Sequence, residues 1–270
     1  TINTAPAKPT ITSTGPLNFC AGGNITLDAP VGFSSYLWSD GDTNQSRIVA
    51  TSLTLTLTVT NVSGCQSIDS DPITTNVFAL PAKPTITGAT SFCTGGSVLL
   101  SAPLSSSYLW SDGDTNQTRT ISTAVTLTVK VTNSNGCESI DSDPVTTTEV
   151  SIPSQPGVTN NSGCSGTSIA LNASGGSPGN YRWYSASTGG TAITGFTDDT
   201  FTTPSLISST SYFVAISNGT CESTRTEVIA SVLPLPAAPT VSIPASVCSG
   251  SSVTLNASGT ANGNYRWYDG

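Results

Sequence analysis

One stretch of ten residues returns unchanged further along the chain, and this repetition constrains the fold more than any other feature. The sequence Tyr-Leu-Trp-Ser-Asp-Gly-Asp-Thr-Asn-Gln occupies residues 36–45 and recurs at 108–117, 72 positions later. A second motif, Ser-Ile-Asp-Ser-Asp-Pro, occupies residues 67–72 and 139–144 at the same spacing. Because both motifs share one period, the chain is predicted to be a tandem array of similar units.

A longer variety of the unit follows the first two. Its sequence Gly-Asn-Tyr-Arg-Trp-Tyr occupies residues 179–184 and returns at 263–268, 84 positions later. Each unit opens with two prolines three positions apart: Pro6 and Pro9, Pro81 and Pro84, Pro153 and Pro156, Pro236 and Pro239. Proline fixes φ and extends its predecessor, so these segments are predicted to be semi-rigid linkers. Peptide ligands for other domains are the alternative. Recurrence at every boundary favours linkers.

The domain boundaries follow from the proline pairs. We expect residues 1–5 to be a remnant of a preceding module and residues 236–270 to be the N-terminal part of a fourth one. The three modules between them are predicted at 6–79, 80–152 and 153–235, and are called the first, second and third repeat below. Residues 1–4 align with 76–79, so the chain is predicted to be a window of a longer array. Residues 236–270 would then need covering by further strands.

Within each repeat the pattern has a period of two, as half-buried antiparallel strands require. Residues 53–60 alternate aliphatic side chains with threonine. We expect Thr54, Thr56 and Thr58 to face solvent. The tryptophans Trp38, Trp110 and Trp183 are predicted to be buried, with Tyr36, Tyr108 and Tyr181 on the same sheet face. No segment has a helical stripe, so the chain is predicted to be all-β, a series of β-sandwiches.

The seven cysteines occur in two alternating contexts, and none forms a C-x-x-C pair. Cys20, Cys93, Cys164 and Cys248 are each followed by glycine two positions on, whereas Cys65, Cys137 and Cys221 each follow a turn. Pairing each cysteine of the first type with the next of the second type predicts Cys20 with Cys65, Cys93 with Cys137 and Cys164 with Cys221. Cys248 then has its partner outside the chain. Disulfides of this kind indicate an extracytoplasmic compartment.

Composition excludes several classes of function. The chain has 8 Lys plus Arg, a net charge of -8 and no histidine. So few cations cannot neutralise a row of phosphates, which argues against nucleic acid and anionic membranes as partners. No apolar run approaches the roughly 18 residues of a membrane span. Lack of histidine removes the commonest general base and metal ligand. We therefore expect no enzyme, no cofactor and no membrane insertion.

The order of elements resembles a known family. Each repeat begins with Cys-x-Gly and a strand, followed by Tyr-x-Trp and a hairpin. A strand of alternating aliphatic residues and threonine comes next, then Gly-Cys or Thr-Cys, and then the last strand. This order is similar to the bacterial immunoglobulin-like repeats of large secreted Bacteroidota surface proteins. Residues 181–184, with 188–191 and 201–206 after them, resemble the variety found beside type IX secretion sorting domains. The resemblance implies tandem immunoglobulin-like β-sandwich modules joined by short Pro-rich linkers. We expect each disulfide at one pole of its sandwich, where it would clamp a loop to a turn.

Two acidic turns are weak candidates for calcium. Asp40, Asp42 and Asn44, and likewise Asp112, Asp114 and Asn116, place oxygen side chains at alternate positions, as a calcium loop does. The later positions of that loop lack its glycine and glutamate, and Asp-Gly is by itself a hairpin signal. An ordinary polar turn is the favoured interpretation.

Other polar residues admit a chemical and a plain interpretation. The adjacent pair Asp198 and Asp199 could suggest a glycosidase, but neighbouring residues on a strand point to opposite faces, which favours a solvated loop. Arg182, Tyr184, Arg266 and Tyr268 could stack on a sugar. A strand surface with arginine laid over tyrosine is favoured instead. Sequons at Asn24, Asn61, Asn172 and Asn256 arise largely from composition.

These observations lead to one expected function and one alternative. Near-identity of the first two repeats favours a structural or adhesive segment of a long cell-surface or secreted protein, since duplication adds length whereas catalysis needs one unique constellation. The resemblance implies a type IX secretion substrate such as a gliding-type adhesin. Its candidate partners are neighbouring modules, secretion machinery, other surface proteins and extracellular glycans. The alternative is a set of glycan-binding or spacer modules on a secreted polysaccharide-degrading enzyme.

Overall fold

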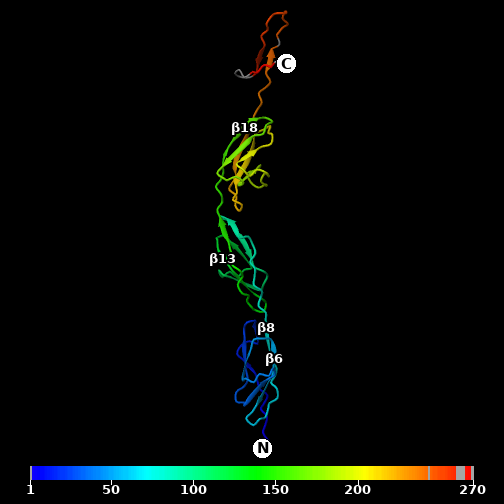
Figure 1. The fold of residues 1–270 in the computed structure, drawn as a ribbon, viewed down its shortest axis with the longest axis vertical. Coiled ribbons are helices and arrows are strands. Elements are labelled where there is room, and N and C mark those ends of the chain that lie inside the picture. The colour runs from blue at the N-terminus through cyan, green and yellow to red at the C-terminus, as the bar shows by residue number, and fades with distance from the viewer. Residues whose placement is uncertain (1, 243, 260–264, 269–270) are drawn as a thin grey trace. The chain divides into compact units, whose positions relative to one another are not determined.

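The chain folds as strands throughout, as the sequence predicts. A computed structural model describes residues 2–242, 244–259 and 265–268. Within these residues Figure 1 shows arrows and connecting loops without any coiled ribbon, so no helix long and apolar enough to cross a membrane is present there. The chain separates into two compact units, Thr1–Glu149 and Val150–Gly270. Each unit is described by itself.

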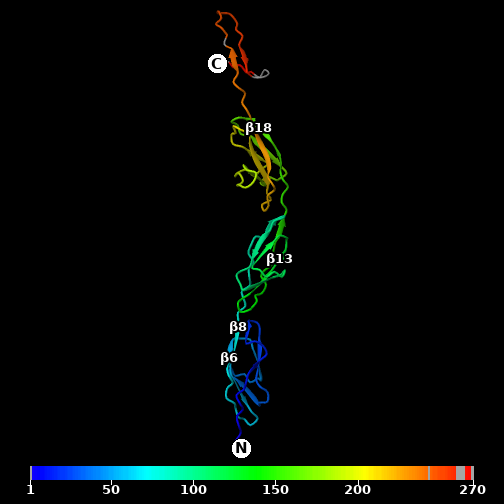
Figure 2. The same cartoon turned by 180° about the vertical axis from the view of Figure 1, so that it is seen from behind.

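The first unit begins with a β-sandwich whose core joins strands of separate sheets. One sheet has the order β1-β3-β5, a second has the order β2-β8-β6, and β4 pairs with β7. Figures 1 and 2 both show β6 and β8 side by side. Leu27 of β3, Trp38 of β4 and Leu57 of β7 meet in one buried cluster. The strands are β1 (Thr12–Ser13), β2 (Asn18–Cys20), β3 (Ile25–Asp28), β4 (Ser35–Trp38), β5 (Ser46–Val49), β6 (Leu53–Leu55), β7 (Leu57–Thr60) and β8 (Ile73–Phe78).

The second repeat, in the same unit, reproduces these pairings around its own core. Strand β10 pairs with β12, β11 with β14, β13 with β15, and β16 lies beside β9. Leu100, Trp110 and Val129 are at most 1% exposed in its cluster. The strands are β9 (Ser91–Cys93), β10 (Val98–Ser101), β11 (Ser107–Trp110), β12 (Thr118–Ile121), β13 (Thr126–Leu127), β14 (Val129–Thr132), β15 (Val145–Thr146) and β16 (Thr148–Val150).

The second unit contains the third repeat as a sandwich of two continuous sheets. One sheet has the order β17-β19-β21 and the other the order β18-β23-β22-β20. Trp183 stacks on Phe201, with ring centroids 5.4 Å apart, and Tyr212 packs against the same phenyl ring. The strands are β17 (Gly157–Thr159), β18 (Asn161–Cys164), β19 (Ala170–Ser174), β20 (Tyr181–Tyr184), β21 (Thr200–Thr202), β22 (Thr210–Ile216) and β23 (Thr226–Leu233).

The remaining described part of this unit holds one short antiparallel pair, β24 (Thr240–Ser242) with β25 (Asn256–Ser258). Its apolar side chains are half exposed, with Leu255 at 49% and Trp267 at 56%. Part of the motif at 263–268 lies outside the described residues.

The predicted inward and outward faces are confirmed. Trp38, Trp110 and Trp183 are at most 1% exposed, Tyr181 is buried, and Tyr36 and Tyr108 pack half-buried against the same cores as their tryptophans. Leu55 and Leu57 are buried, whereas Thr54 is exposed and Thr56 and Thr58 are half exposed.

The segment predicted as one strand over residues 53–60 changes sheet in its middle. Strand β6 pairs with β8, whereas β7 pairs with β4. At the break, the amide of Thr56 donates to Ser39 Oγ at 3.1 Å, and its carbonyl accepts from the amide of Ser39 at 2.9 Å. The side-chain alternation continues through the break, so the sequence pattern alone does not reveal it.

Candidate functional site: the joints between repeats

The turn that ends in the second type of cysteine holds the incoming linker. In the second repeat, Asn133 Nδ2 donates to the carbonyl of Ala79 at 3.0 Å, while Asn133 Oδ1 accepts from the amides of Asn135 and Cys137 at 3.0 and 3.1 Å. One amide side chain therefore folds the turn and binds the linker. Asn61 makes the same bond to Thr4, and Asn218 makes it to Ser151. We call this contact the asparagine clasp and this end of each repeat its incoming pole.

The sulfur of the turn cysteine lies at the incoming pole as well. Cys65 Sγ is 3.7 Å from the carbonyl of Asn3, and Cys221 Sγ is 3.6 Å from the carbonyl of Val150. Both carbonyls belong to the residue directly before the one held by the clasp. The turn cysteine therefore faces the chain that arrives from the previous repeat.

The first type of cysteine lies where the chain leaves a repeat. Strand β2 runs parallel to the final strand β8 with Cys20 opposite Phe78, and the amide of Ala21 donates to the Phe78 carbonyl at 2.8 Å. In the third repeat, Cys164 stands opposite Leu233 in the same parallel arrangement. Phe78 and Leu233 end the last strands of their repeats. This end is the outgoing pole.

The two types of cysteine consequently sit at opposite poles, and the predicted pairings within repeats are wrong. Cys20 is bonded to Cys137, with the sulfurs 1.97 Å and the Cα atoms 5.6 Å apart. The bridge joins the outgoing pole of the first repeat to the incoming pole of the second, while each repeat keeps its own buried cluster. Cys65, Cys164 and Cys248 are thiols, and Cys93 and Cys221 are disulfide-bonded.

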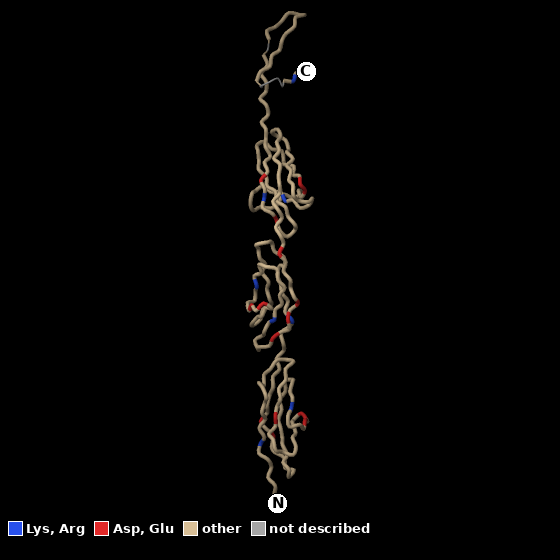
Figure 3. The backbone as a smooth tube through the Cα atoms, turned by 90° about the vertical axis from the view of Figure 1, so that its left-hand side faces the viewer, with Lys and Arg blue, Asp and Glu red and all other residues tan. Residues whose placement is uncertain are grey.

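In the first two repeats, a lysine of the linker adds an ion pair to an aspartate shortly before β8 or β15 of its own repeat. Lys8 Nζ lies 2.5 Å from Asp71, and Lys83 pairs with Asp143. The lysines are roughly two-fifths exposed and the aspartates more than four-fifths, so each pair contributes at most about 1 kcal/mol. Figure 3 shows how few and scattered the charged residues are within each unit. These pairs orient the linker more than they stabilise it.

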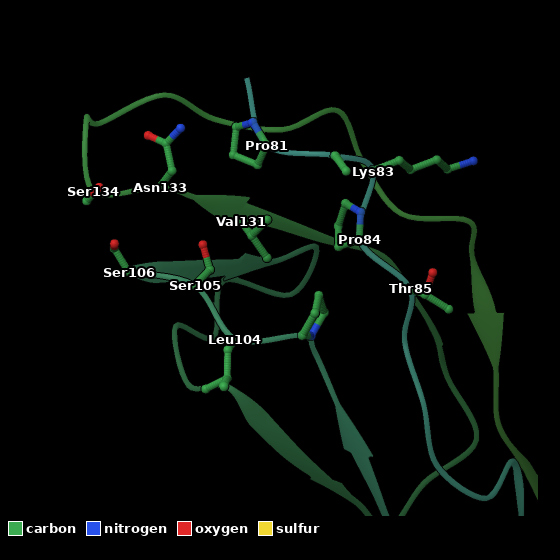
Figure 4. Close-up of a pocket in the computed structure, with 12 residues that line it drawn as sticks. Pro81, Lys83, Pro84, Thr85, Leu104, Ser105, Ser106, Val131, Asn133 and Ser134 are labelled. Carbon is green, nitrogen blue, oxygen red and sulfur yellow. The ribbon is translucent and has the colours of Figure 1, made fainter. Parts of the chain in front are cut away.

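A shallow groove lies beside the linker of the second repeat. Linker residues Pro81, Lys83 and Pro84 border it on one side, Ser105 and Ser106 border it on the other, and Val131 lies between (Figure 4). The Lys83 side chain points away from the groove in this view. The groove contains no paired acid and base, and its lining is that of a linker resting on its repeat.

The acidic turns bind an arginine of the same repeat. Asp40 Oδ2 accepts from Arg47 Nη2 at 2.7 Å, and Asp42 lies 3.3 Å from Arg47 Nε. Asp42 Oδ1 also accepts from the backbone and side-chain nitrogens of Asn44. The Arg47 hydrogen bond lowers the pKa of Asp40 below its usual value. The turn oxygens proposed for calcium thus already have a cationic partner.

The second repeat has the same arrangement. Arg119 pairs with Asp112 and Asp114, and its hydrogen bond lowers the pKa of Asp112. Asn116 donates to Asp114 from both its backbone and its side-chain nitrogen. Among the described residues, no group of three or more His, Cys, Asp or Glu side chains could hold a metal ion.

The repeated Ser-Ile-Asp-Ser-Asp-Pro motif has a structural role that the sequence analysis did not identify. Ser67 Oγ accepts from the amide of Val59, and Ser70 Oγ accepts from the amide of Leu57, both at 3.0 Å. The serines thereby take the place of backbone carbonyls along the edge of β7. Ser139, Ser142 and Ser223 do the same in the later repeats, and all five are at most 7% exposed. The signal was the spacing of the serines, two and five residues beyond the turn cysteine.

The candidate sugar-binding residues of the third repeat are committed to the fold. Tyr184 is 6% exposed, and the Arg225 guanidinium lies 3.2 Å from the centre of its ring. Its hydroxyl is 2.8 Å from both carboxylate oxygens of Glu222. Burial, followed by the hydrogen bond to Glu222, raises the Tyr184 pKa. The arginine that covers Tyr184 is Arg225, in the segment between β22 and β23, and not Arg182.

The remaining candidates lie on loops and edges. Asp198 and Asp199 are exposed, and Asp198 accepts from the amide of Gly179 at 3.1 Å, as a loop anchor does. Among the sequons, Asn61 forms an asparagine clasp, while Asn24, Asn172 and Asn256 are exposed. Arg266 and Tyr268 are exposed. None of these residues assembles a catalytic pair within the described part of the chain.

Comparison with known proteins agrees with this architecture. Residues 153–234 and 236–270 each match the model of a family described as "Ig-like domain CHU_C associated". These segments are therefore similar to a bacterial immunoglobulin-like repeat, and the chain is an all-β series of immunoglobulin-like β-sandwich modules. No curated protein sequence matches the chain.

The solved structures that match the chain are distant in sequence. The FN1–FN3 domains of chicken CNTN1 are 14% identical, with 84% of this chain and all of that chain covered, at a TM-score of 0.34. A Ca2+-stabilised adhesin that helps an Antarctic bacterium bind ice is 14% identical, with 88% and 76% covered, at 0.37. A 1.5-MDa bacterial ice-binding adhesin is 14% identical, with 83% and 98% covered, at 0.35.

Proposed function

We propose that this chain is a non-enzymatic structural segment of a long multi-repeat cell-surface or secreted protein. The observation that carries the proposal is the recurrence of the asparagine clasp at the incoming pole of all three repeats. What recurs in the array is the attachment of one repeat to the chain before it, as in proteins built by stacking nearest neighbours. The acidic turns of the first two repeats and the buried serines of all three serve the fold of their own repeats.

The finer assignment rests on the sequence resemblance. We propose a type IX secretion substrate of the gliding-adhesin kind, displayed outside the cell, where disulfides persist. The modules are proposed at 6–79, 80–152 and 153–235, with parts of neighbouring modules at 1–5 and 236–270. The proposed partners are those neighbouring modules, together with secretion machinery or other surface proteins, whereas extracellular glycans are the partners of the alternative below.

The alternative, a glycan-binding segment of a secreted polysaccharide-degrading enzyme, is favoured by one observation. Trp267 is 56% and Tyr268 is 83% exposed, and both line a groove with Pro236 and Pro239. Exposed aromatic rings are the groups on which sugars stack. Tyr184 of the third repeat is buried and offers no such surface.

A glycan array probed with the purified chain tests the proposal. A structural segment should give no saturable signal on any glycan. Saturable binding that is lost in Trp267→Ala and retained in Trp183→Phe would overturn the proposal and favour the glycan-binding alternative. Duplication of residues 80–152 within the parent protein supplies a positive test. It should increase the reach of the distal end by one repeat without changing what that end binds.

A further inference from the structure

We propose that the first repeat carries a binding site for an arginine side chain of a partner protein. The site is a hollow of about 390 Å³ on the solvent-facing side of β4 and β7. It is bordered by Leu37 and Ser39, by Thr58 of the paired strand, and by Gln66 and Asp69 from the segment after the turn cysteine. The second repeat has a hollow of about 440 Å³ at the equivalent positions. The hollow is therefore a recurring feature of the first two repeats.

The third repeat shows what this face holds when it is filled. Tyr184 takes the position of Ser39, directly after the buried tryptophan. Arg225 takes the position of Asp69, four residues after the turn cysteine. The Arg225 guanidinium lies 3.2 Å from the centre of the Tyr184 ring, and its Nε lies 4.0 Å from Glu222 Oε1. An arginine of the same chain thus closes this face in the third repeat.

In the first repeat the same face offers acceptors and an apolar surface. Asp69 is exposed and makes no hydrogen bond or ion pair to any residue that the structure describes. Gln66 Nε2 donates to Thr58 Oγ1 at 3.0 Å, which leaves the side-chain carbonyl of Gln66 as an acceptor. Leu37 is 46% exposed and can pack against methylene groups. A guanidinium has five N–H donors in one plane on an aliphatic stem, so arginine matches this combination.

The charges of the repeat leave the hollow open for an arginine from outside. Arg47 is held by Asp40 and Asp42 of the acidic turn, and no Lys or Arg is among the described residues that line the hollow. The chain has a net charge of -8, which favours the approach of a basic protein surface. A single ion pair at an exposed carboxylate is weak, so free arginine would dissociate readily. An arginine carried on a protein gains further contacts around the hollow. The site adds this recognition to the proposed structural function.

The second repeat provides an internal comparison. Lys130 takes the position of Thr58 and borders the hollow together with Asp141. Within the described residues, Lys130 makes no ion pair, so its charge is available to repel an incoming guanidinium. Glu138, in the position of Gln66, is not among the described residues that line this hollow. We therefore expect the second repeat to bind arginine more weakly than the first.

NMR spectra of the full chain with isotope-labelled leucine methyl groups test the proposal. The probe is N-acetylarginine amide, and its neutral counterpart of the same shape is N-acetylcitrulline amide. At constant ionic strength, the Leu37 methyl signals should move saturably with the arginine probe and stay in place with the citrulline probe. The Leu109 signals of the second repeat should move less. Absence of a saturable shift at Leu37, or an equal shift with both probes, would overturn the proposal.

Matched variants assign the binding to the hollow. Asp69→Asn should weaken binding at Leu37 about threefold to fivefold, because it removes the charge of the acceptor. Asp141→Asn, the same change in the second repeat, should leave the Leu37 response unaltered. Lys130→Thr gives the second repeat the residue of the first and should make the Leu109 signals respond as well. Full binding in Asp69→Asn, or no gain at Leu109 in Lys130→Thr, would refute the site. The glycan array result is independent of these outcomes, so the two proposals fail separately.

Discussion

The third repeat and the residues after it contain the same Tyr-Arg-Trp-Tyr motif in two different environments. Strand β20 carries Tyr-Arg-Trp-Tyr at 181–184, where Trp183 is completely buried. Residues 265–268 carry the same four side chains, and there Trp267 is 56% exposed. Leu171 in β19 and Leu255, directly before β25, differ in the same way, at 0% and 49% exposed.

The difference lies in what covers the motif. In the third repeat, β22 pairs with β20 along its length, and Phe201 and Tyr212 close over the tryptophan. The described strands after residue 236 are β24 and β25, which pair with each other. The alternating pattern therefore specifies which face of a strand is apolar, whereas burial of that face depends on strands that follow much later in the chain.

The largest expected effect is the difference in stability between alanine substitutions at Trp183 and at Trp267. Trp183→Ala should destabilise the third repeat by about 3 to 5 kcal/mol, because it leaves a cavity beside Phe201 and Tyr212. Trp267→Ala should change the stability of that repeat by less than about 0.5 kcal/mol. Hydrogen exchange of the β22 and β23 amides, followed by mass spectrometry, reports the stability of this repeat alone. Equal losses of protection in the two variants would refute the comparison.

The next effect tests the serine that completes the covering strand. Ser223 Oγ accepts from the buried amide of Ile216 at 3.0 Å. Ser223→Ala leaves that amide without its acceptor and should cost about 1 to 3 kcal/mol. Ser249→Ala changes an exposed serine in the residues after 236 and serves as the control. The same exchange measurement applies, and a Ser223→Ala protein as protected as the control would show that water replaces the hydroxyl.

The inward position of the tryptophans can be predicted from the sequence, whereas the pairing of the cysteines cannot. The position of Trp183 on an inward face follows from its period-two spacing with Tyr181, which needs only local information. The partner of Cys20 depends on the parallel pairing of β2 with β8, which places that cysteine at the outgoing pole. No local pattern encodes a pairing over nearly 60 residues. Pairing the cysteines by their order along the chain therefore assigned Cys65 to Cys20, although Cys65 lies at the incoming pole of the repeat.

In the candidate site, too, local features can be predicted from the sequence, whereas contacts between distant residues cannot. The acidic turns can be located from Asp-Gly alone, since a hairpin signal is local. The partnership of Asp40 with Arg47 depends on how the hairpin closes. The asparagine clasp was missed because it joins a turn to a linker more than 50 residues earlier in the chain. Its signal was an asparagine three or four residues before every turn cysteine.

A pH-dependent effect should distinguish Tyr184 from Tyr268. Burial and Glu222 raise the Tyr184 pKa, and burial raises that of Tyr212, so the folded repeat holds both phenolic protons more tightly than the unfolded chain does. Their contribution to stability is complete below the ordinary tyrosine pKa of about 10 and falls as pH rises through the raised values. The third repeat should therefore lose stability above about pH 10.

Tyr184→Phe isolates the part due to this one phenol. Its stability should fall less steeply above about pH 10, with only the share of Tyr212 remaining. At neutral pH the variant should lose about 1 kcal/mol, because the hydrogen bond to Glu222 is absent. Tyr268→Phe, at the exposed counterpart, should follow the parent curve throughout. Urea denaturation at a series of pH values, read by exchange in β22, measures both variants. A parent-like slope in Tyr184→Phe would contradict the assignment.

The smallest effect concerns the arginine of the motif. Arg182 Nη1 donates to the carbonyls of Gly179 and Tyr181 at 2.8 and 2.7 Å, which holds the turn before β20. The side chain is partly exposed, so water replaces most of what Arg182→Gln removes, and the loss should be about 0.5 kcal/mol or less. Arg266→Gln is the matched change at an exposed position and should leave the third repeat unaltered. Exchange of the Tyr181 and Arg182 amides gives the difference between the two variants.

Because both arginines were candidates for a sugar-binding surface, the same pair of variants also belongs on the glycan array. A binding signal lost in Arg266→Gln but kept in Arg182→Gln would place a ligand site on the exposed copy of the motif and none on the covered one.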